Sequence, residues 1–174
     1  MKSVVTARAI MADAAPMNVD CGIYCGKACC RPDEDGQGGM YLFPGEEELI
    51  TYHTWARISD TAMPVSGRRV KLLACYAPCP REHRPLACMI FPLTPIIRDE
   101  KPDARIDARC LGICPITRNG LIGLNKAFIE AARTVIELIA AEPEGFSFLM
   151  DWYAEEAHFR SAVRDFRSII RQRP

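Results

Sequence analysis

Residues 21–30 read Cys-Gly-Ile-Tyr-Cys-Gly-Lys-Ala-Cys-Cys, which places four cysteines within ten positions. Thiolate ligands must converge on one ion at about 2.3 Å, and short spacings achieve this because closing a short loop costs little entropy. Cysteines used as small core hydrophobes would instead fall on apolar faces without regard to one another. The clustering therefore favours metal ligands. Later groups complete the set of nine, which are Cys21, Cys25, Cys29, Cys30, Cys75, Cys79, Cys88, Cys110 and Cys114.

The spacing within the first group predicts a bent backbone. On a regular helix, Cys21, Cys25 and Cys29 would lie along one face. Gly22 and Gly26 count against such a helix and suit a metal knuckle, in which backbone N–H groups point at the thiolate sulfurs. Because Cys29 and its neighbour at position 30 point in different directions, either they serve different sites or one of them is a core thiol.

The expected chemistry of the cysteines depends on the cellular compartment of the protein. Residues 1–18 lack the apolar run of a signal peptide, and no run of about 18 apolar residues occurs in the chain. We therefore expect a cytoplasmic protein with no membrane segment, in which cysteines bind metal or do redox chemistry more often than they form disulfides. An odd number also fits a complete disulfide set badly. The formal net charge of 0 gives no overall basic field that would attract nucleic acid.

Length and composition predict one globular domain. The chain has 174 residues, of which 49% are hydrophobic and 25% charged, close to the average for soluble domains. We expect a flexible N-terminal segment over 1–18, a cysteine-cluster region over 19–118 and a helical hairpin over 122–172. The expected fold class is α+β, with a small irregular metal-stabilised cysteine-rich part containing short strands, covered by the C-terminal helical hairpin.

The middle of the chain predicts little regular structure. Residues 40–43 and 69–74 are strand candidates, and three glutamates at 46–48 are expected to cap the first turn of a helix. Between residues 63 and 115 the chain holds eight prolines, which exclude long helices and central strands. We expect a bound metal, and not a hydrogen-bonded ladder, to organise this part.

The last third predicts two helices. Asn125 is the expected N-cap of the first, which Pro143 and Gly145 end. The second begins at about residue 147, and its C-terminal arginines suit the end of a helix better than a nucleic-acid surface. The expected buried face of the first helix is Phe128, Ile129, Ala132, Val135, Ile136 and Ile139. That of the second is Leu149, Trp152, Tyr153, Phe159, Val163, Phe166 and Ile170.

Two segments resemble a known family. Cys-Gly-Lys-Ala-Cys-Cys at 25–30 and Arg-Pro-Leu-Ala-Cys-Met-Ile-Phe-Pro at 84–92 are similar to the YkgJ-type cysteine-cluster family, described as a zinc- or iron-chelating domain. The similarity spans residues 21 to about 115. Each gap in the first cysteine run is one residue longer than in the family, and Met89 replaces an arginine. Some flagellin lysine N-methylases look similar over this region, which implies methyl transfer as an alternative activity.

The sequence thus predicts a metal-binding protein that holds zinc or an iron–sulfur cluster, because tetrahedral sulfur coordination suits either. Cys110 is the expected spare, and the remaining eight thiols would make two four-sulfur sites. One alternative is a cluster-dependent enzyme with redox or methyl-transfer activity, and another is a metal-stabilised interaction module. His83 is the histidine to test as a ligand. The predicted ligands are Cys21, Cys25, Cys29, Cys30, Cys75, Cys79, Cys88 and Cys114.

Overall fold

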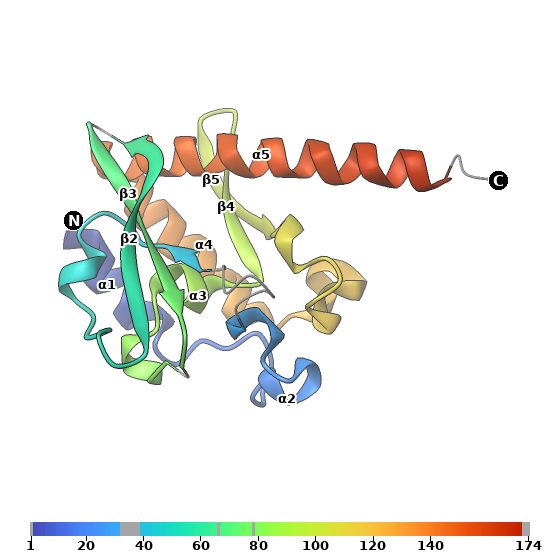
Figure 1. Cartoon of the computed structure of the whole chain (residues 1–174), viewed down its shortest axis with the longest axis horizontal. Coiled ribbons are helices and arrows are strands. Elements are labelled where there is room, and N and C mark those ends of the chain that lie inside the picture. The colour runs from blue at the N-terminus through green and yellow to red at the C-terminus, as the bar shows by residue number, and fades with distance from the viewer. Residues whose placement is uncertain (1, 32–38, 66, 78, 172–174) are drawn as a thin grey trace.

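The computed structural model describes residues 2–31, 39–65, 67–77 and 79–171, and for residues 65, 159 and 162–171 it describes the backbone alone. Figure 1 shows α5 crossing one end of the strands while α2 lies on the side away from it. The fold is mixed α+β, as predicted, and its metal stabilisation stays a prediction. The helices are Lys2–Met11 (α1), Gly22–Cys25 (α2), Leu86–Ile90 (α3), Lys126–Ala140 (α4) and Pro143–Arg171 (α5). The strands are Met40–Tyr41 (β1), Ala56–Val65 (β2), Arg68–Cys75 (β3), Leu93–Arg98 (β4) and Lys101–Ile106 (β5).

One antiparallel sheet has the order β1-β3-β2. The predicted strand at 69–74 is its central strand β3, whereas the strand predicted at 40–43 covers only the two residues of β1. Met40 pairs with Leu73, and Ala56 at the start of β2 pairs with Cys75 at the end of β3. The sheet therefore carries one predicted ligand at the end of its central strand.

The proline-rich middle contains a second sheet, which corrects the prediction that no ladder organises it. Strands β4 and β5 form an antiparallel hairpin through Asp99 and Glu100, whose φ angles of 50° and 60° suit a tight two-residue turn. Pro95 and Pro102 fit because a two-stranded ladder leaves every second N–H of each strand without a partner. The expectation of no long helix here is confirmed, since α3 has five residues. The expectation of no central strand is wrong, because β3 lies between Pro64 and Pro78 and is central in its sheet.

Residues 2–11 form helix α1, within the segment 1–18 that the sequence analysis expected to be flexible. Val4, Ala7 and Met11 of α1 are spaced three and four residues apart, and each is at most 1% exposed. They enter the main hydrophobic core together with α3, α4, α5 and β4. The apolar stripe that packs α1 against α4 thus fixes the start of the chain.

Helix α4 confirms the prediction for residues 125–140. The Asn125 side chain accepts a hydrogen bond from the backbone N–H of Ala127, which caps the helix, and all six predicted apolar residues are buried. The following break is shorter than expected, because Pro143 begins α5 and Gly145 lies inside it. A Cβ on Gly145 would collide with the carbonyl oxygen of Ile139, so only glycine allows α5 to start this close to α4.

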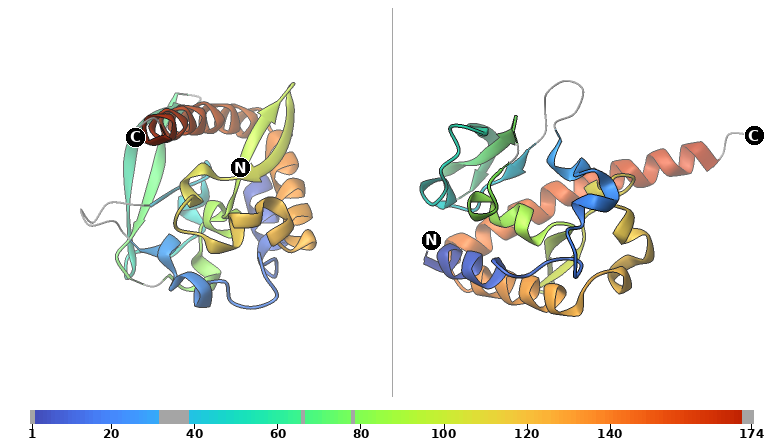
Figure 2. Two further views of the ribbon diagram at one scale, coloured as in Figure 1. Left: turned by 90° about the vertical axis from the view of Figure 1, so that its right-hand side faces the viewer. Right: turned by 90° about the horizontal axis from the view of Figure 1, so that it is seen from below.

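Helix α5 packs against the strands. Leu149 and Trp152 are buried, and the Trp152 Nε1 donates a hydrogen bond to Thr94 Oγ1 of β4 at 3.1 Å. Contacts with β2 and β4 show that the helical pair covers the sheets, where the sequence predicted that it covers the cysteines. The end of α5 extends beyond the rest of the fold in Figure 1 and in the right-hand view of Figure 2. The rest of the predicted apolar face of α5 lies outside the described side chains, as do most of its C-terminal arginines. The apolar positions are Phe159, Val163, Phe166 and Ile170, and the arginines are Arg164, Arg167, Arg171 and Arg173.

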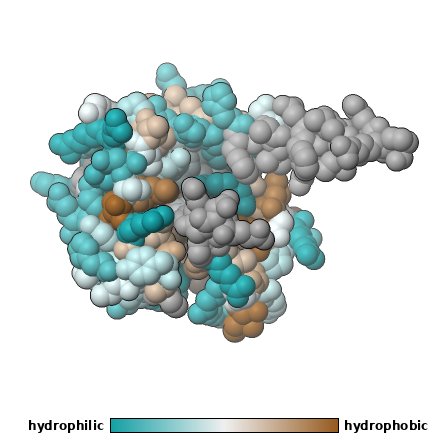
Figure 3. Space-filling view, viewed as in Figure 1, coloured by the Kyte–Doolittle hydropathy of each residue, from teal (hydrophilic) through white to brown (hydrophobic). Residues whose placement is uncertain are grey.

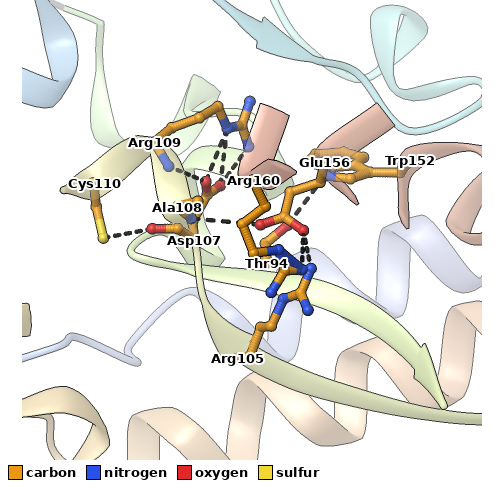
Figure 4. A network of polar contacts seen from close by, with 9 residues as sticks. All are labelled: Thr94, Arg105, Asp107, Ala108, Arg109, Cys110, Trp152, Glu156 and Arg160. Carbon is orange, nitrogen blue, oxygen red and sulfur yellow. Dashed lines mark hydrogen bonds and ion pairs between the residues drawn. The ribbon is translucent and has the colours of Figure 1, made fainter. Parts of the chain in front are cut away.

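A buried carboxylate joins α5 to the segment that follows β5 (Figure 4). Glu156 forms ion pairs with Arg105 of β5 and with Arg160 one turn along α5. Its Oε1 lies 3.5 Å from the backbone nitrogen of Ala108. These contacts anchor the single 3-10 turn Ala108–Cys110 beneath α5 and so position the last group of cysteines.

A second buried carboxylate joins three segments on the other side of the molecule. The glutamates at 46–48 form one 3-10 turn, and Glu46 is fully buried where the sequence predicted only a helix cap. Glu46 accepts hydrogen bonds from the backbone N–H groups of Phe43 and Leu86 at 3.1 and 2.6 Å. It also pairs with Arg8 of α1 at 2.8 Å. The carboxylate thus ties α1 and the start of α3 to the chain after β1.

No helix in the described ranges is long and apolar enough to cross a membrane. The face seen in Figure 3 is mostly hydrophilic, with small separate apolar patches, one of them over α2 at the lower edge. Ile23 and Tyr24 of α2 are 76% and 60% exposed, in agreement with that patch.

Replacing Glu46 by alanine is expected to destabilise the fold. The change leaves Arg8 without its buried counter-charge and two backbone N–H groups without an acceptor, at a cost of about 3 kcal/mol. Urea unfolding followed by circular dichroism measures the free energy of unfolding. The matched control is Glu48→Ala in the same turn, where the side chain is exposed and a change within about 0.5 kcal/mol is expected. Equal effects of the two substitutions would contradict this account.

Candidate metal centre

Predicted ligands from distant parts of the chain surround one cavity of about 530 Å³. Apolar side chains such as Met11, Phe91 and Ile116 form much of its wall, and Arg8, Arg81 and Arg84 contribute positive charge. The cavity brings together the first cysteine group, α3 and the loop before residue 115. Six of the predicted ligands line it, namely Cys21, Cys25, Cys29, Cys30, Cys88 and Cys114.

The first cysteine group is bent as its glycines predict. Helix α2 is a single turn that ends at Gly26, whose φ of 58° lies in the left-handed region that favours glycine. Lys27 also has a positive φ, and a 3-10 turn over Ala28–Cys30 follows. The Cys25 Sγ lies 3.9 Å from the carbonyl oxygen of Cys21, one turn earlier in the chain.

Neither thiol of the adjacent pair is a core thiol. Cys29 and Cys30 are both exposed, and their Sγ atoms lie 3.9 Å apart. A hydrogen bond from the Cys29 thiol lowers the pKa of Cys30 to about 6, and the same interaction raises the pKa of Cys29. Each of the two thiols is therefore available as a metal ligand at the mouth of the cavity. Whether the two serve different sites stays a prediction.

The second cysteine group lies between the cavity and a smaller core. Cys75 and Cys79 pack against a cluster that contains Leu73 and Trp55, whereas Cys88 on α3 lines the cavity. Burial raises the pKa of Cys75 to about 11, and it raises the pKa of Cys88 as well. These thiols hold their protons in the metal-free protein, and a metal ion would have to displace them.

Arg84 is a site residue that the sequence analysis missed. Its side chain lines the cavity and lies within electrostatic range of Cys79, Cys30 and Cys88, which raise the pKa of its guanidinium. Its Nε is buried and has no hydrogen-bond partner in the described part of the chain. The Arg-Pro pair at 84–85 was visible as part of the family resemblance, but nothing in the sequence assigned the arginine a place among the thiols.

Arg8 holds the segment that carries this arginine. Besides its ion pair with Glu46, the guanidinium donates to the carbonyl oxygens of Arg84 and Glu82 at 2.7 and 2.9 Å. Since Glu46 also binds the N–H of Leu86, one ion pair fixes the backbone on both sides of residue 85. The wall of the cavity is thus positioned by contacts independent of the cysteines.

Cys110 differs from the other cysteines. It is fully buried, and its Sγ donates to the carbonyl oxygen of Asp107 at 2.7 Å and lies 3.5 Å from Thr117 Oγ1. Cys114, four residues later, is half-buried and faces the cavity. These hydrogen bonds suit a structural thiol, and the sequence analysis expected Cys110 to be the spare cysteine.

The thiols surround the cavity without forming a coordination sphere in this conformation. Among the residues that the structure describes, no three Cys, His, Asp or Glu side chains stand close enough together to hold one ion. His83, the histidine singled out by the sequence, receives a hydrogen bond on Nδ1 from the Thr51 N–H at 3.4 Å. His53 and His158 are exposed. Binding of a metal would require rotation of cysteine side chains toward a common point.

No protein-family model matches this sequence, no curated protein is significantly similar to it, and no solved structure matches its fold. The resemblance to YkgJ-type proteins therefore stays a prediction from the quoted residues.

The burial pattern predicts which thiols react first. In the reduced, metal-free protein, we expect N-ethylmaleimide to modify Cys29 and Cys30 early because both are exposed. Cys110 is expected to react only after the chain unfolds. Mass spectrometry of samples quenched at successive times measures the order, with urea-unfolded protein as the control in which all thiols react. Early modification of Cys110 in the folded protein would contradict the assignment.

Proposed function

We propose that this protein is a metal-binding protein that holds zinc or an iron–sulfur cluster through cysteine thiolates at the described cavity. The observation that carries the proposal is the convergence of six cysteines on one cavity from segments up to 93 residues apart, Cys21 and Cys114 being the most distant pair. Soft thiolate donors in this number favour zinc, copper(I) or iron–sulfur clusters over harder cations. Tetrahedral coordination by four sulfurs suits both zinc and iron–sulfur clusters.

The exposure of the cysteines supports a ligand role. Free cysteine is among the most deeply buried residue types when it acts as a small hydrophobe. In this chain only Cys110 is buried, and the other eight are half-buried or exposed. These eight are the same residues that the sequence singled out as ligands. A role in metal binding accounts for retaining so many accessible thiols, which core packing does not.

The charge around the cavity also suits thiolates. Four thiolates around one divalent ion carry a net charge of −2, which an interior tolerates when cations or N–H donors lie beside the sulfurs. Arg84 supplies a fixed positive charge next to Cys79, Cys30 and Cys88, and its free Nε–H can donate to a metal-bound sulfur. The backbone N–H groups of Gly26 and Lys27 at the bend donate to the carbonyl oxygen of Gly22, so they are not directed at a sulfur in this conformation.

One alternative, a metal-dependent enzyme, is favoured by the size of the cavity. Its volume of about 530 Å³ is larger than a metal ion needs. It falls in the range of about 300–1,000 Å³ typical of small-molecule sites, and its walls are largely apolar, as in such sites. The interaction module has less support. Phe148 and Trp152 of α5 are 0% and 2% exposed, so these aromatic side chains pack inside the fold and do not offer a surface to a partner.

Anaerobic purification followed by elemental analysis tests the proposal. Zinc bound in a colourless protein would indicate a metal scaffold, and iron with acid-labile sulfide in a brown protein would indicate a cluster and move the enzyme alternative forward. A protein that contains none of these metals and takes up neither Zn²⁺ nor iron and sulfide on reconstitution would overturn the proposal.

Cys88→Ser is expected to lower the metal content by half or more. The matched control is Cys110→Ser, in which the serine hydroxyl can still donate to the Asp107 carbonyl, so the metal content should stay at the wild-type value. Circular dichroism and size-exclusion chromatography establish that both variants are folded. Equal metal content in the two folded variants would remove Cys88 from the set of ligands.

A further inference from the structure

We infer that the cavity binds a small monocarboxylate with an apolar chain, whose carboxylate pairs with Arg84 and whose chain lies along the apolar wall. Such a ligand would occupy the space beside the cysteines. Its binding goes beyond the proposed metal function and does not depend on it.

The cavity is large enough for an organic molecule. Its volume is about 530 Å³. Because one water molecule takes up about 30 Å³ in the liquid, this space has room for roughly 15–20 atoms of similar size. A fatty acid with a chain of about ten carbons fits within that limit. The size of the cavity therefore allows both a head group and a chain.

The apolar wall of the cavity runs from the core to the solvent. Met11 of α1 lines the cavity at its inner side and is 1% exposed. Val19 and Ile113 also line it, and they are 51% and 41% exposed. Exposed apolar side chains that gather at one place mark binding sites on soluble proteins. An apolar chain that lies along this wall would remove these side chains from water.

Arg84 is a half-buried cation without an anionic partner. Among the residues that the structure describes, it forms no ion pair with a carboxylate, and its Nε has no hydrogen-bond partner. The other arginines of the wall differ. Arg8 is neutralised by Glu46, and Arg81 is exposed and donates to the carbonyl oxygen of Ala12 at 3.2 Å. Because removing a cation from water without a counter-charge costs free energy, the cavity favours one negative charge beside Arg84.

The acidic side chains of the wall do not supply this charge. Asp20 and Glu82 line the cavity but are exposed, and Asp20 accepts a hydrogen bond from the backbone N–H of Gly22 at 2.9 Å. A thiol with an ordinary pKa of about 8.5 is mostly neutral at pH 7, whereas a carboxylic acid with an ordinary pKa of about 4 is ionised. A bound carboxylate would therefore balance the charge of Arg84 without ionisation of the cysteines.

The guanidinium group favours a carboxylate over a phosphate ester. Its planar fork of N–H donors matches the two oxygens of a carboxylate in paired, charge-assisted hydrogen bonds. A phosphate monoester carries a charge of about −1.5 to −2 at neutral pH, of which Arg84 can balance one unit. The remaining charge would lie in largely apolar surroundings. A monoanion is therefore the better match for this cavity.

Calorimetric titration with ligands of equal chain length tests the inference. The probes are decanoate, decanol and decylammonium, each added to the purified protein at pH 7 below its critical micelle concentration. We expect saturable binding of one decanoate per chain, binding of decanol that is weaker by about tenfold or more, and no binding of decylammonium. Octanoate should bind roughly fifteenfold more weakly than decanoate, since each buried CH₂ group tightens binding by about fourfold.

Substitution of Arg84 separates the contribution of the head group from that of the chain. Arg84→Gln should weaken decanoate binding by about tenfold or more and leave decanol binding unchanged. The matched control is Arg98→Gln at the exposed end of β4, away from the cavity wall, which should bind both ligands as wild type does. Ala15→Phe adds a ring to the cavity wall and should weaken the binding of both ligands. Circular dichroism establishes that each variant is folded.

The outcomes separate this inference from the proposed function. Equal affinities of wild type for decanoate and decanol, or an unchanged decanoate affinity in folded Arg84→Gln, would overturn the pairing of a carboxylate with Arg84. No saturable binding of decanoate, either to the protein as purified or after removal of metal with EDTA, would overturn the ligand site. Elemental analysis measures metal in the same samples. Metal binding without decanoate binding would overturn the ligand site alone, and decanoate binding by a protein that takes up no metal would support it while overturning the proposed function.

Discussion

The buried ion pair between Arg8 and Glu46 is the contact on which the geometry of the cysteine cavity depends. Burial raises the pKa of Glu46, and the carboxylate is compensated by Arg8 and by the N–H groups of Leu86 and Phe43. Arg8 also binds two carbonyl oxygens in the segment just before α3. The pair therefore fixes the backbone that bears Arg84 and Cys88, and it does so from α1, a helix with no cysteine. The cavity wall is preorganised by the fold.

Predictions that rest on local patterns agree with the structure. Asn125 and the apolar spacing after it define α4 because a cap and a helical stripe are encoded within a few residues. The strand β3 and the bend at Gly26 are local in the same sense. Residues 1–18 were misjudged because the apolar stripe of α1 was tested only as a signal peptide and not as a core helix. Pro95 and Pro102 misled because their effect depends on pairing: a two-stranded hairpin accepts them, and a central strand does not.

The candidate site, like the fold, could be predicted from the sequence only in part. The clustering of the cysteines and the family resemblance singled out eight thiols, and the structure distinguishes the ninth, Cys110, by its burial and by its hydrogen bond to Asp107. The sequence could not predict that Glu46 is buried, because its burial depends on contacts with Arg8 and Leu86, which are 38 and 40 residues away.

A metal would act on only part of this fold. The main core joins α1, α3, α4, α5 and β4 through hydrocarbon contacts, and two antiparallel ladders pair the strands. The described segments around the cavity are different: α2 has four residues, the turns at 28–30 and 108–110 have three each, and several cysteines lie in the loops between them. Short turns of this kind retain few hydrogen bonds to hold them against the entropy of the chain. If the proposed metal binds, thiolate coordination would order residues 20–31 and 110–116 against a body that is already folded, and its removal would be expected to disorder the cavity mouth before it weakens the helices.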